Sequence, residues 1–352
     1  MATDNTHPVH RKITLNDIAR ECAVSRATVS LVLRGSPLVN TRTRARVEEE
    51  LRRQGYVYNR AAANLRRRTS SSIALVLNDL ANPFFAEFAA GVDAAVGDAG
   101  FVTLLGCTSE SPAREQAVLG SLIEHGPAGI ILSPAEHSGA EHVLAALGAR
   151  MPLLLFNREL GGDLPEYAHW DLLMLDDQRG ARLATEHLIA QGHRRIAFFG
   201  GHGDSSSCRQ RHAGYVEAMQ AAGLPIEPRW RVECAPTRLD AASRTAALFA
   251  TAPVPTAAVC YNDAVALGLM LGLYQRGVQP GRDFAITGFD DIAEAAVSMP
   301  SLTTLSTAPR ERGRQAAELL LQRLREPAAS SHRSIAPVKL MVRDSSAPPP
   351  TA

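Results

Sequence analysis

The chain has 352 residues, of which 45% are hydrophobic and 21% are charged, and its formal net charge is +1. This balance is typical of a globular protein of two or three domains, and it excludes a largely disordered chain. No segment approaches the roughly 20 apolar residues of a membrane span, and the polar N-terminus lacks the apolar core of a secretory signal. The five cysteines have no metal-binding or disulfide spacing, so we expect a cytoplasmic protein without a metal ion or another cofactor.

The first 70 residues are basic, although the chain as a whole is almost neutral. They contain 14 Lys and Arg against 6 Asp and Glu, a charge of +8, and the other 282 residues carry −7. A basic segment on a mildly acidic body is typical of a protein that binds nucleic acid, and a solvated tail is the alternative. The regular helical pattern within this segment favours nucleic acid.

Three short helices are predicted in residues 13–58. Thr14 begins a capping-box pattern and therefore predicts the start of the first helix. Ser25 is expected to cap the second helix and Asn40 the third, which ends at Gly55. Two short helices joined by a tight turn predict a helix-turn-helix domain, in which the second helix enters the major groove of DNA.

The outer face of the second helix carries side chains suited to DNA. Arg26 can donate two hydrogen bonds to a guanine, and Ala27 can contact a thymine methyl group. Leu31 is apolar on a face expected to be exposed, which suits an apolar base edge. The alternatives are a surface arginine and a stray exposed leucine. The candidate DNA contacts of this domain, which include hydroxyl and amide groups for phosphates, are Thr14, Ser25, Arg26, Ala27, Thr28, Ser30, Leu31 and Asn40.

Residues 59–72 are predicted to form a hinge helix and a linker. The alanine-rich and arginine-rich part is too short for a stable isolated helix, but it suits a segment that folds on DNA. Leu65 lies among arginines and is predicted to insert into the minor groove as a wedge, with a plain basic linker as the alternative. The candidate DNA contacts here are Asn59, Ala62, Leu65 and Arg66.

In residues 73–343, short aliphatic runs alternate with helical stretches, which predicts parallel sheets covered by helices. About 270 residues are too many for one such sheet, so we expect two lobes. The proline-rich residues 344–352 are expected to be disordered. The predicted buried strands are 73–77, 102–105, 129–132, 152–156, 196–199, 257–260 and 284–287.

Several spaced motifs occur in one order along the chain. They include Val24-Ser25-x-x-Thr28-Val29-Ser30, Asn82-Pro83-Phe84-Phe85, Arg211-x-x-Gly214-Tyr215, Asn262-Asp263 and Gly288-Phe289-Asp290-Asp291. On these motifs the chain resembles the lactose-repressor (LacI) family from residue 13 to about residue 343. It departs from the family at Tyr58, where the family usually has proline, so the entry to the hinge helix is less rigid here. The resemblance implies a small all-α helix-turn-helix head joined to an α/β two-lobed domain like that of periplasmic binding proteins.

The resemblance also implies which residues contact a small effector between the lobes. Ligands bind such sheets at the carboxyl ends of the strands, where several polar side chains of this chain lie. The asparagines and aspartates could instead cap the following helices, and we expect this for Asp263 and Asp291. Arg158 could serve either a ligand or an ion pair. The expected effector contacts are Phe84, Phe85, Asn157, Arg158, Arg209, Arg211, Asn262 and Asp290.

These features predict a ligand-responsive transcription regulator that represses genes of carbohydrate metabolism. The expected partners are a pseudo-palindromic double-stranded DNA operator, a sugar or sugar derivative, and a second copy of the chain in a homodimer, with no membrane. One alternative is a sugar-binding protein without DNA binding. Another is an enzyme on a doubly wound fold, which no catalytic motif in the sequence supports.

Overall fold

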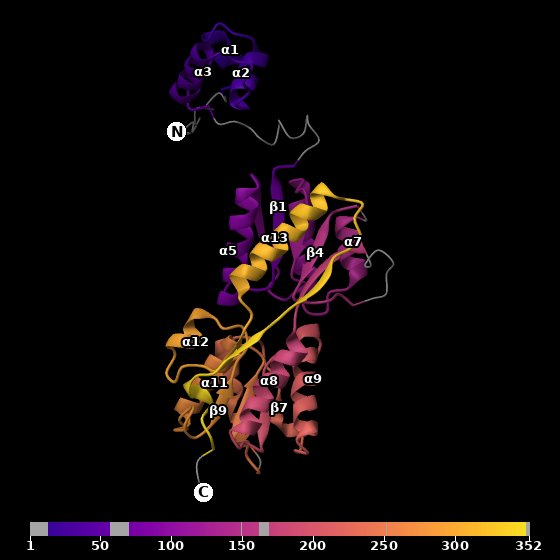
Figure 1. Ribbon diagram of the computed structural model, residues 1–352, viewed down its shortest axis with the longest axis vertical. Coiled ribbons are helices and arrows are strands. Elements are labelled where there is room, and N and C mark those ends of the chain that lie inside the picture. The colour runs from indigo at the N-terminus through magenta and orange to yellow at the C-terminus, as the bar shows by residue number, and fades with distance from the viewer. Residues whose placement is uncertain (1–12, 57–69, 149, 162–168, 251, 350–352) are drawn as a thin grey trace, which may run out of the picture. The chain divides into compact units, whose positions relative to one another are not determined.

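The computed structural model describes residues 13–56, 70–148, 150–161, 169–250 and 252–349. The chain divides into two units, Met1–Thr69 and Ser70–Ala352, and the division falls within the predicted linker (Figure 1). None of the helices in the described ranges is long and apolar enough to cross a membrane.

The N-terminal unit contains the three predicted helices, which are α1 (Leu15–Glu21), α2 (Arg26–Leu33) and α3 (Thr41–Arg53). Thr14 and Asp17 form the complete capping box of α1. The side chains of Ser25 and Asn40 cap α2 and α3 by accepting hydrogen bonds from Thr28 N and Thr43 N. The three predicted helix starts are therefore confirmed.

A small apolar core holds these helices together. Ile18, Val29 and Val47 are fully buried at its centre, one from each helix. Leu31 is not on an exposed face as predicted, because it is half-buried and packs against this core. Both α1 and α3 contact α2, so they cover a wider part of its surface than a single apolar stripe.

The C-terminal unit has two lobes. Lobe 1 is built on a six-stranded sheet in the order β11-β5-β4-β3-β1-β2, in which every neighbouring pair is parallel. In Figure 1, α13 lies across this sheet beside α5, and these two helices pack against each other. The strands are β1 (Ser72–Leu77), β2 (Val102–Cys107), β3 (Ile130–Leu132), β4 (Leu153–Phe156), β5 (Asp171–Leu175) and β11 (Arg333–Ala336), and the helices are α5 (Pro83–Asp98), α6 (Pro112–Glu124), α7 (Ala140–Leu147) and α13 (Pro309–Arg325).

Lobe 2 is built on a four-stranded parallel sheet in the order β7-β6-β8-β9 and a two-stranded antiparallel ladder of β10 and β12. Its strands are β6 (Ile196–Phe199), β7 (Arg231–Val232), β8 (Ala257–Cys260), β9 (Ala285–Thr287), β10 (Thr304–Ser306) and β12 (Lys339–Met341). Its helices are α8 (Asp177–Ala190), α9 (Ser206–Ala221), α10 (Arg238–Arg244), α11 (Asp263–Gln275) and α12 (Ala293–Val297), with short 3₁₀ turns at Pro228–Trp230, Thr245–Phe249 and Asp344–Ser346.

The chain passes between the lobes three times: from β5 to α8, from β10 to α13, and from β11 to β12. Each lobe is therefore assembled from segments far apart in the sequence. Three short connections between two packed bodies provide the geometry of a hinge, about which the lobes can open and close.

All seven predicted strands are present, but one of them is not buried. Val102 and Leu105 of β2 are 53% and 48% exposed, because β2 is the edge strand of its sheet. The prediction of a disordered end from residue 344 is also wrong as far as residue 349. Ser345 and Ser346 are buried, and Ser345 Oγ donates a hydrogen bond to Ile286 O at 2.7 Å, which fixes this segment on lobe 2.

Candidate functional site

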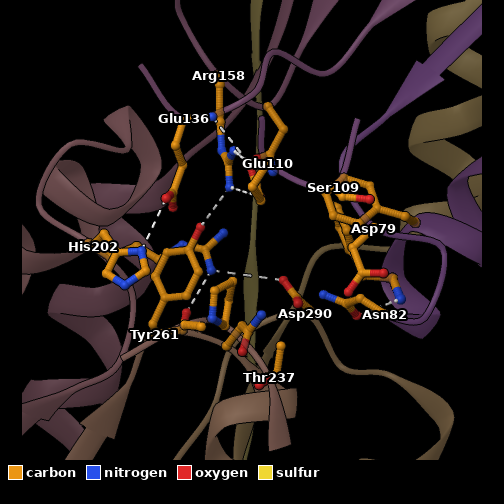
Figure 2. A pocket seen from close by; sticks show the side chains of 17 residues that line it. Asp79, Asn82, Ser109, Glu110, Glu136, Arg158, His202, Thr237, Tyr261 and Asp290 are labelled. Carbon is orange, nitrogen blue, oxygen red and sulfur yellow. Dashed lines mark hydrogen bonds and ion pairs between the residues drawn. The ribbon is translucent and has the colours of Figure 1, made fainter. Parts of the chain in front are cut away.

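A cavity of about 330 Å³ lies between the two lobes of the C-terminal unit (Figure 2). Its residues follow the carboxyl ends of β1, β2, β3 and β4 in lobe 1 and of β6, β7, β8 and β9 in lobe 2. This is the edge at which parallel sheets bind ligands. The lining residues are Asp79, Asn82, Phe84, Phe85, Ser109, Glu110, Glu136, Asn157, Arg158, His202, Arg211, Ala235, Pro236, Thr237, Tyr261, Asn262 and Asp290.

The cavity contains seven of the eight expected effector contacts, and Arg209 is the exception. Arg209 is exposed, and its Nη1 donates a hydrogen bond to Asp204 O at 2.7 Å. Side chains two residues apart on a helix point in directions about 200° apart, so Arg209 and Arg211 of α9 face opposite sides. The choice between these arginines therefore falls on Arg211.

Arg211 is fixed at the base of the cavity by lobe 2. Its Nε donates to Asp177 Oδ1 at 2.7 Å, and its Nη1 donates to Tyr261 O at 2.6 Å and lies 3.9 Å from Asp290 Oδ1. The guanidinium carbon is 3.7 Å from the centre of the Phe289 ring. Burial opposes the charge of Arg211, but Asp177, Tyr261 and Asp290 raise its pKa above the ordinary value. Arg211 is therefore a rigid, permanently charged group.

Asp290 has an unusual backbone and lies at the same wall of the cavity. Its φ of +122° is rare for a residue with a side chain, and such strain is found mainly at functional sites. Burial raises the pKa of Asp290 well above its ordinary value, while Arg211 acts in the opposite direction. Asp290 does not cap a helix, since the N-cap of α12 is Ile292 and makes no side-chain hydrogen bond.

Asn262 lines the cavity as expected, whereas the neighbouring Asp263 and Asp291 differ from expectation. Asn262 also caps α11, because its Oδ1 accepts from Val265 N at 2.9 Å. Asp263 and Asp291 were expected to be caps and are not. Asp263 is fully buried and accepts hydrogen bonds from Thr304 Oγ1 and Ile292 N, and Asp291 forms an ion pair with Arg343 at 2.6 Å.

Aromatic rings and an ion pair form the lobe 1 side. Phe84 and Phe85 are edge-to-face with ring centres 5.0 Å apart, at the start of α5 where Asn82 caps the helix. Arg158 makes an ion pair rather than leaving its charge free: its Nη1 and Nη2 donate to the two carboxylate oxygens of Glu110 at 2.7 and 3.0 Å. Asn157, with a φ of +64°, has a buried Oδ1 with no hydrogen-bond partner within the described residues.

Sequence reasoning missed ten residues of the cavity. They are Asp79, Asn82, Ser109, Glu110, Glu136, His202, Ala235, Pro236, Thr237 and Tyr261. Tyr261 directly follows a predicted strand, and Asp79, Ser109, Glu110 and Glu136 follow predicted strands by two to five residues. The signal that identified Asn157 and Asp290 was therefore available for them. Ala235 to Thr237 follow β7, whose two residues are too short to recognise in a sequence.

The candidate DNA contacts lie at the surface of the N-terminal unit or outside the described residues. Arg26 and Ala27 are exposed at the first two positions of α2. The exposed group also includes Thr14, Ser25 and Asn40, whereas Thr28, Ser30 and Leu31 are half-buried. The hinge candidates Asn59, Ala62, Leu65 and Arg66 lie outside the described residues. No cluster of side chains that could hold a metal ion occurs in the described part of the chain.

Known proteins match both units. Residues 14–59 match the family of bacterial regulatory proteins described as lacI, and residues 185–346 match the periplasmic binding protein-like domain. The maltose regulon regulatory protein MalI of Escherichia coli (strain K12) is 32% identical over 343 residues, which cover 94% of this chain and 98% of MalI.

Solved structures agree with these matches. The lac repressor dimer, bound to its operator and the anti-inducer ONPF, has a TM-score of 0.83 at 25% identity and covers 96% of this chain and 100% of its own. The complex of the transcriptional regulator CelR with cellobiose has a TM-score of 0.71 at 29% identity and covers 95% and 99%. The match of the DNA-binding head excludes the alternative of a sugar-binding protein without DNA binding. With MalI similar over nearly the whole of both chains, this chain belongs to the LacI family of bacterial regulatory proteins and is a DNA-binding transcription regulator, not an enzyme.

Proposed function

We propose that this regulator represses genes of carbohydrate metabolism and that a sugar or sugar derivative in the cavity changes its affinity for operator DNA. The observation that carries the proposal is the cavity itself, which combines carboxylates, amides, arginines and aromatic rings at the strand ends of both lobes. Each buried hydroxyl of a sugar needs a polar partner, and its ring needs an apolar face. The names of MalI, a maltose regulon protein, and of the CelR–cellobiose complex support this class of effector.

The roles of the effector contacts follow from their chemistry. Asp290 and Asn157 accept hydrogen bonds from effector hydroxyls, whereas Asn262 and Arg211 donate hydrogen bonds to effector oxygens. Phe84 and Phe85 form the apolar wall against which a sugar ring packs. Because these residues belong to both lobes, an effector that contacts them favours the closed arrangement over the open one.

At the operator, Arg26 reads a guanine and Ala27 a thymine methyl group, while Thr14, Ser25, Thr28, Ser30 and Asn40 bond phosphates. Leu31 is half-buried, so only the exposed part of its side chain contacts the DNA. In the hinge segment, Asn59, Ala62 and Arg66 contact the minor groove and Leu65 inserts into it. The regulator acts in the cytoplasm, where its operator DNA is found.

The active form is a homodimer on a pseudo-palindromic operator, since one helix-turn-helix reads only a few base pairs. An apolar face of lobe 2 supports this proposal. Leu271 and Tyr274 of α11 are 50% and 47% exposed, and Val297 at the end of α12 and Met299 just after it are 81% and 85% exposed. Tyr274 OH donates to Met299 O at 2.7 Å, so the exposed residues of α11 lie beside those at the end of α12. Apolar faces of this kind usually mark protein interfaces.

The proposal is tested by selecting an operator from random DNA and then screening saccharides against the complex. A saccharide that stabilises the protein to heat and also changes the operator Kd supports the proposal. If saccharides do neither, and an effector of another chemical class does both, the proposed effector class is wrong.

A further inference from the structure

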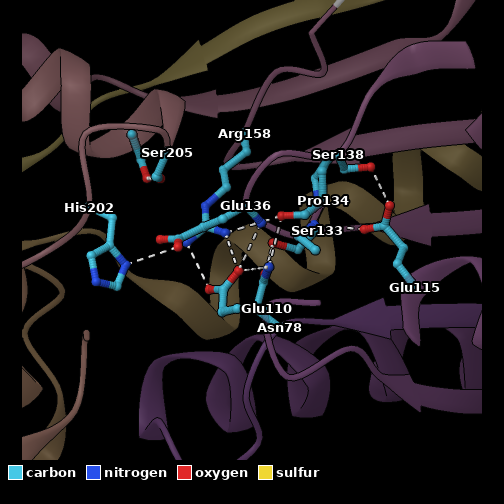
Figure 3. Close-up of polar contacts among 12 residues, drawn as sticks. Asn78, Glu110, Glu115, Ser133, Pro134, Glu136, Ser138, Arg158, His202 and Ser205 are labelled. Carbon is cyan, nitrogen blue, oxygen red and sulfur yellow. Dashed lines mark hydrogen bonds and ion pairs between the residues drawn. The ribbon is translucent and has the colours of Figure 1, made fainter. Parts of the chain in front are cut away.

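One wall of the effector cavity holds a carboxylate in a cradle of hydrogen-bond donors (Figure 3). Glu110 Oε2 accepts from Arg158 Nη1 at 2.7 Å, from Asn78 Nδ2 at 3.1 Å and from Glu136 N at 3.1 Å. Glu110 Oε1 accepts from Arg158 Nη2 at 3.0 Å. Two side chains and one backbone amide, from the ends of three different strands, therefore converge on one carboxylate.

The donors of this cradle are held in place without the help of Glu110. Asn78 is fully buried, its Nδ2 also donates to Pro134 O at 2.8 Å, and its Oδ1 accepts from Ser133 Oγ. Arg158 is 4% exposed and also donates to Pro134 O at 3.2 Å. A guanidinium, an amide and a backbone N–H group, fixed in a concave wall, are what an anion-binding site requires.

Glu110 reaches the cradle through a strained loop between β2 and α6. Ser109 and Glu110 have φ angles of +51° and +59°, in the left-handed region that residues with a side chain rarely occupy. Such strain persists where the surrounding contacts over-determine it, and it concentrates at functional sites. The loop therefore places a carboxylate where a bound anion would otherwise lie.

We propose that Glu110 is an internal counter-anion that fills an anion-binding cradle in the cavity wall, and that it restricts the effector to uncharged or cationic compounds. Phosphorylated and carboxylated saccharides are excluded, because the guanidinium that would bind their charge is already neutralised. This inference rests on the proposed effector site, and it narrows the chemistry of the effector.

The remaining charges of the cavity agree with this restriction. Four carboxylates, those of Asp79, Glu110, Glu136 and Asp290, line it against the two guanidinium groups of Arg158 and Arg211. The side chains that line the cavity therefore carry a formal charge of −2 with His202 neutral, and of −1 if Asp290 is also protonated. Arg211 is itself paired with a buried carboxylate, at 2.7 Å. Both guanidinium groups of the cavity are therefore already paired with carboxylates, and an anionic effector would meet no unpaired positive charge.

Among the residues that line the cavity, Arg158 Nε is a buried donor without a hydrogen-bond partner in the described part of the chain. Glu136 Oε1 and Asn157 Oδ1 are buried acceptors without a partner there. A buried acceptor without a partner is costly, so a ligand that donates hydrogen bonds to both is favoured. Hydroxyl groups and amines donate such bonds, whereas phosphate and carboxylate anions only accept them.

The direct test replaces the internal carboxylate with one from solution. Glu110→Ala empties the cradle, and acetate, formate or inorganic phosphate is then added to the full-length protein. At equal ionic strength against sodium chloride, these anions should raise the Tm of Glu110→Ala by about 2–4 °C more than that of the wild type. Glu141→Ala is the matched control, because it removes one exposed carboxylate of lobe 1 outside the cavity and keeps any anion binding by the basic head.

An equal response of Glu110→Ala, Glu141→Ala and the wild type would overturn the proposal. Glu110→Gly, which also empties the cradle and adopts the φ of +59° without strain, provides the same comparison if the alanine variant does not fold. A Glu110 that only stabilises its loop would lower the Tm of the variant without creating a response to anions. The gain in anion binding therefore separates the two roles.

The consequence for the effector is tested on the wild type with saccharides and their phosphate esters in matched pairs. Within each pair that binds, the neutral compound should bind at least about tenfold more tightly, and Glu110→Ala should reduce or reverse this ratio. Tighter binding of the phosphate ester by the wild type would overturn the inference. Failure of every saccharide to alter operator binding would instead count against the proposed function, and the anion response of Glu110→Ala would still be measurable.

Discussion

At the scale of single residues, Arg26 is the side chain on which operator choice should depend most. It is exposed at the first position of α2, and Ser25 caps the helix just before it, which fixes the direction of the helix start. The guanidinium of Arg26 makes no ion pair with another described residue and is available for a base. Its fixed fork of donors matches guanine O6 and N7.

Arg26→Ala should therefore relax the sequence preference at one operator position per half-site. The expected loss of discrimination is about 1–3 kcal/mol, because one bidentate contact disappears. Competition binding with operators changed at each position measures this effect. Thr41→Ala is the control: Thr41 is exposed at the first position of α3, where we expect its hydroxyl to contact a phosphate, and loss of such a contact should weaken binding to all sequences alike. An unchanged ratio of operator to random-DNA affinity in Arg26→Ala would show that Arg26 does not read a base.

Asp263 should make stability depend on pH. Burial raises the pKa of Asp263 from its ordinary value of 3.8 to about 7, although hydrogen bonds from Thr304 and Ile292 N act in the opposite direction. The folded state therefore binds this proton more tightly than the unfolded state. The resulting stability is present at low pH and is lost as the pH rises from about 4 through about 7.

Asp263→Asn removes this titration and keeps a neutral side chain in place. Relative to the variant, the wild type should lose thermal stability between pH 5 and pH 8. Paired Tm measurements across this range test the expectation, and Asp98→Asn, at an exposed position of α5, corrects for the general effect of removing a charge. Parallel pH profiles of the wild type and Asp263→Asn would contradict it.

At the scale of elements, the contact between α5 and α13 joins segments that are more than 200 residues apart in the sequence. The helices approach closely because each has glycine at the contact. A Cβ atom on Gly91 would lie 2.0 Å from Arg310 O, and one on Gly313 would lie 2.1 Å from Phe88 O. Both neighbours are backbone atoms, so a side chain can enter only if the helices move apart.

Gly91→Ala should consequently destabilise lobe 1 by about 1–3 kcal/mol, as overpacking usually does. Gly97→Ala on the same helix is the matched control. A Cβ there meets nothing within 4 Å, and alanine should stabilise the helix by up to about 1 kcal/mol. Chemical denaturation of both variants measures the difference. Equal stability of the two would mean that the helices are not packed as closely as described.

The strands of the fold were predictable where aliphatic runs form the centre of a sheet, as in 196–199 and 257–260, which agree with β6 and β8 to the residue. β5 was missed although four buried aliphatic residues follow its first residue. That first residue is Asp171, whose buried carboxylate is neutralised by Arg323, 152 residues later. β11 has a mostly exposed pattern at the sheet edge.

The residues of the candidate site were predictable where they follow a predicted strand. The strand-end rule identified Asn157, Asn262 and Asp290, since it needs only the strand positions. It could not show that Arg158 is neutralised by Glu110, 48 residues away, because this pairing depends on the order of strands in the sheet. The rule also could not show whether Arg209 or Arg211 faces the cavity, because this depends on the orientation of α9.

At the scale of the whole molecule, operator binding should require the apolar face of lobe 2. A charge at Val297 or Met299 would be buried in a dimer without a partner, which strongly opposes association. Met299→Asp should therefore shift the protein to monomers and reduce operator affinity by at least about tenfold. Analytical ultracentrifugation and operator titration measure the two effects. Leu239→Asp, at an exposed leucine of α10, is the control. A dimeric Met299→Asp with wild-type affinity would place the interface elsewhere.

The central claim is that a ligand in the cavity between the lobes changes the affinity of the head for DNA. Asp290→Ala tests it most directly, because this residue lines the cavity and belongs to the C-terminal unit, whereas the head is a separate unit. Labelled operator is titrated with the wild type and with Asp290→Ala, each with and without the saccharide found to bind the wild type. The saccharide should change the operator Kd of the wild type about 5-fold to 150-fold and leave that of Asp290→Ala unchanged, with equal affinities in its absence. A wild-type response in Asp290→Ala, at a saccharide affinity that is also unchanged, would contradict the account.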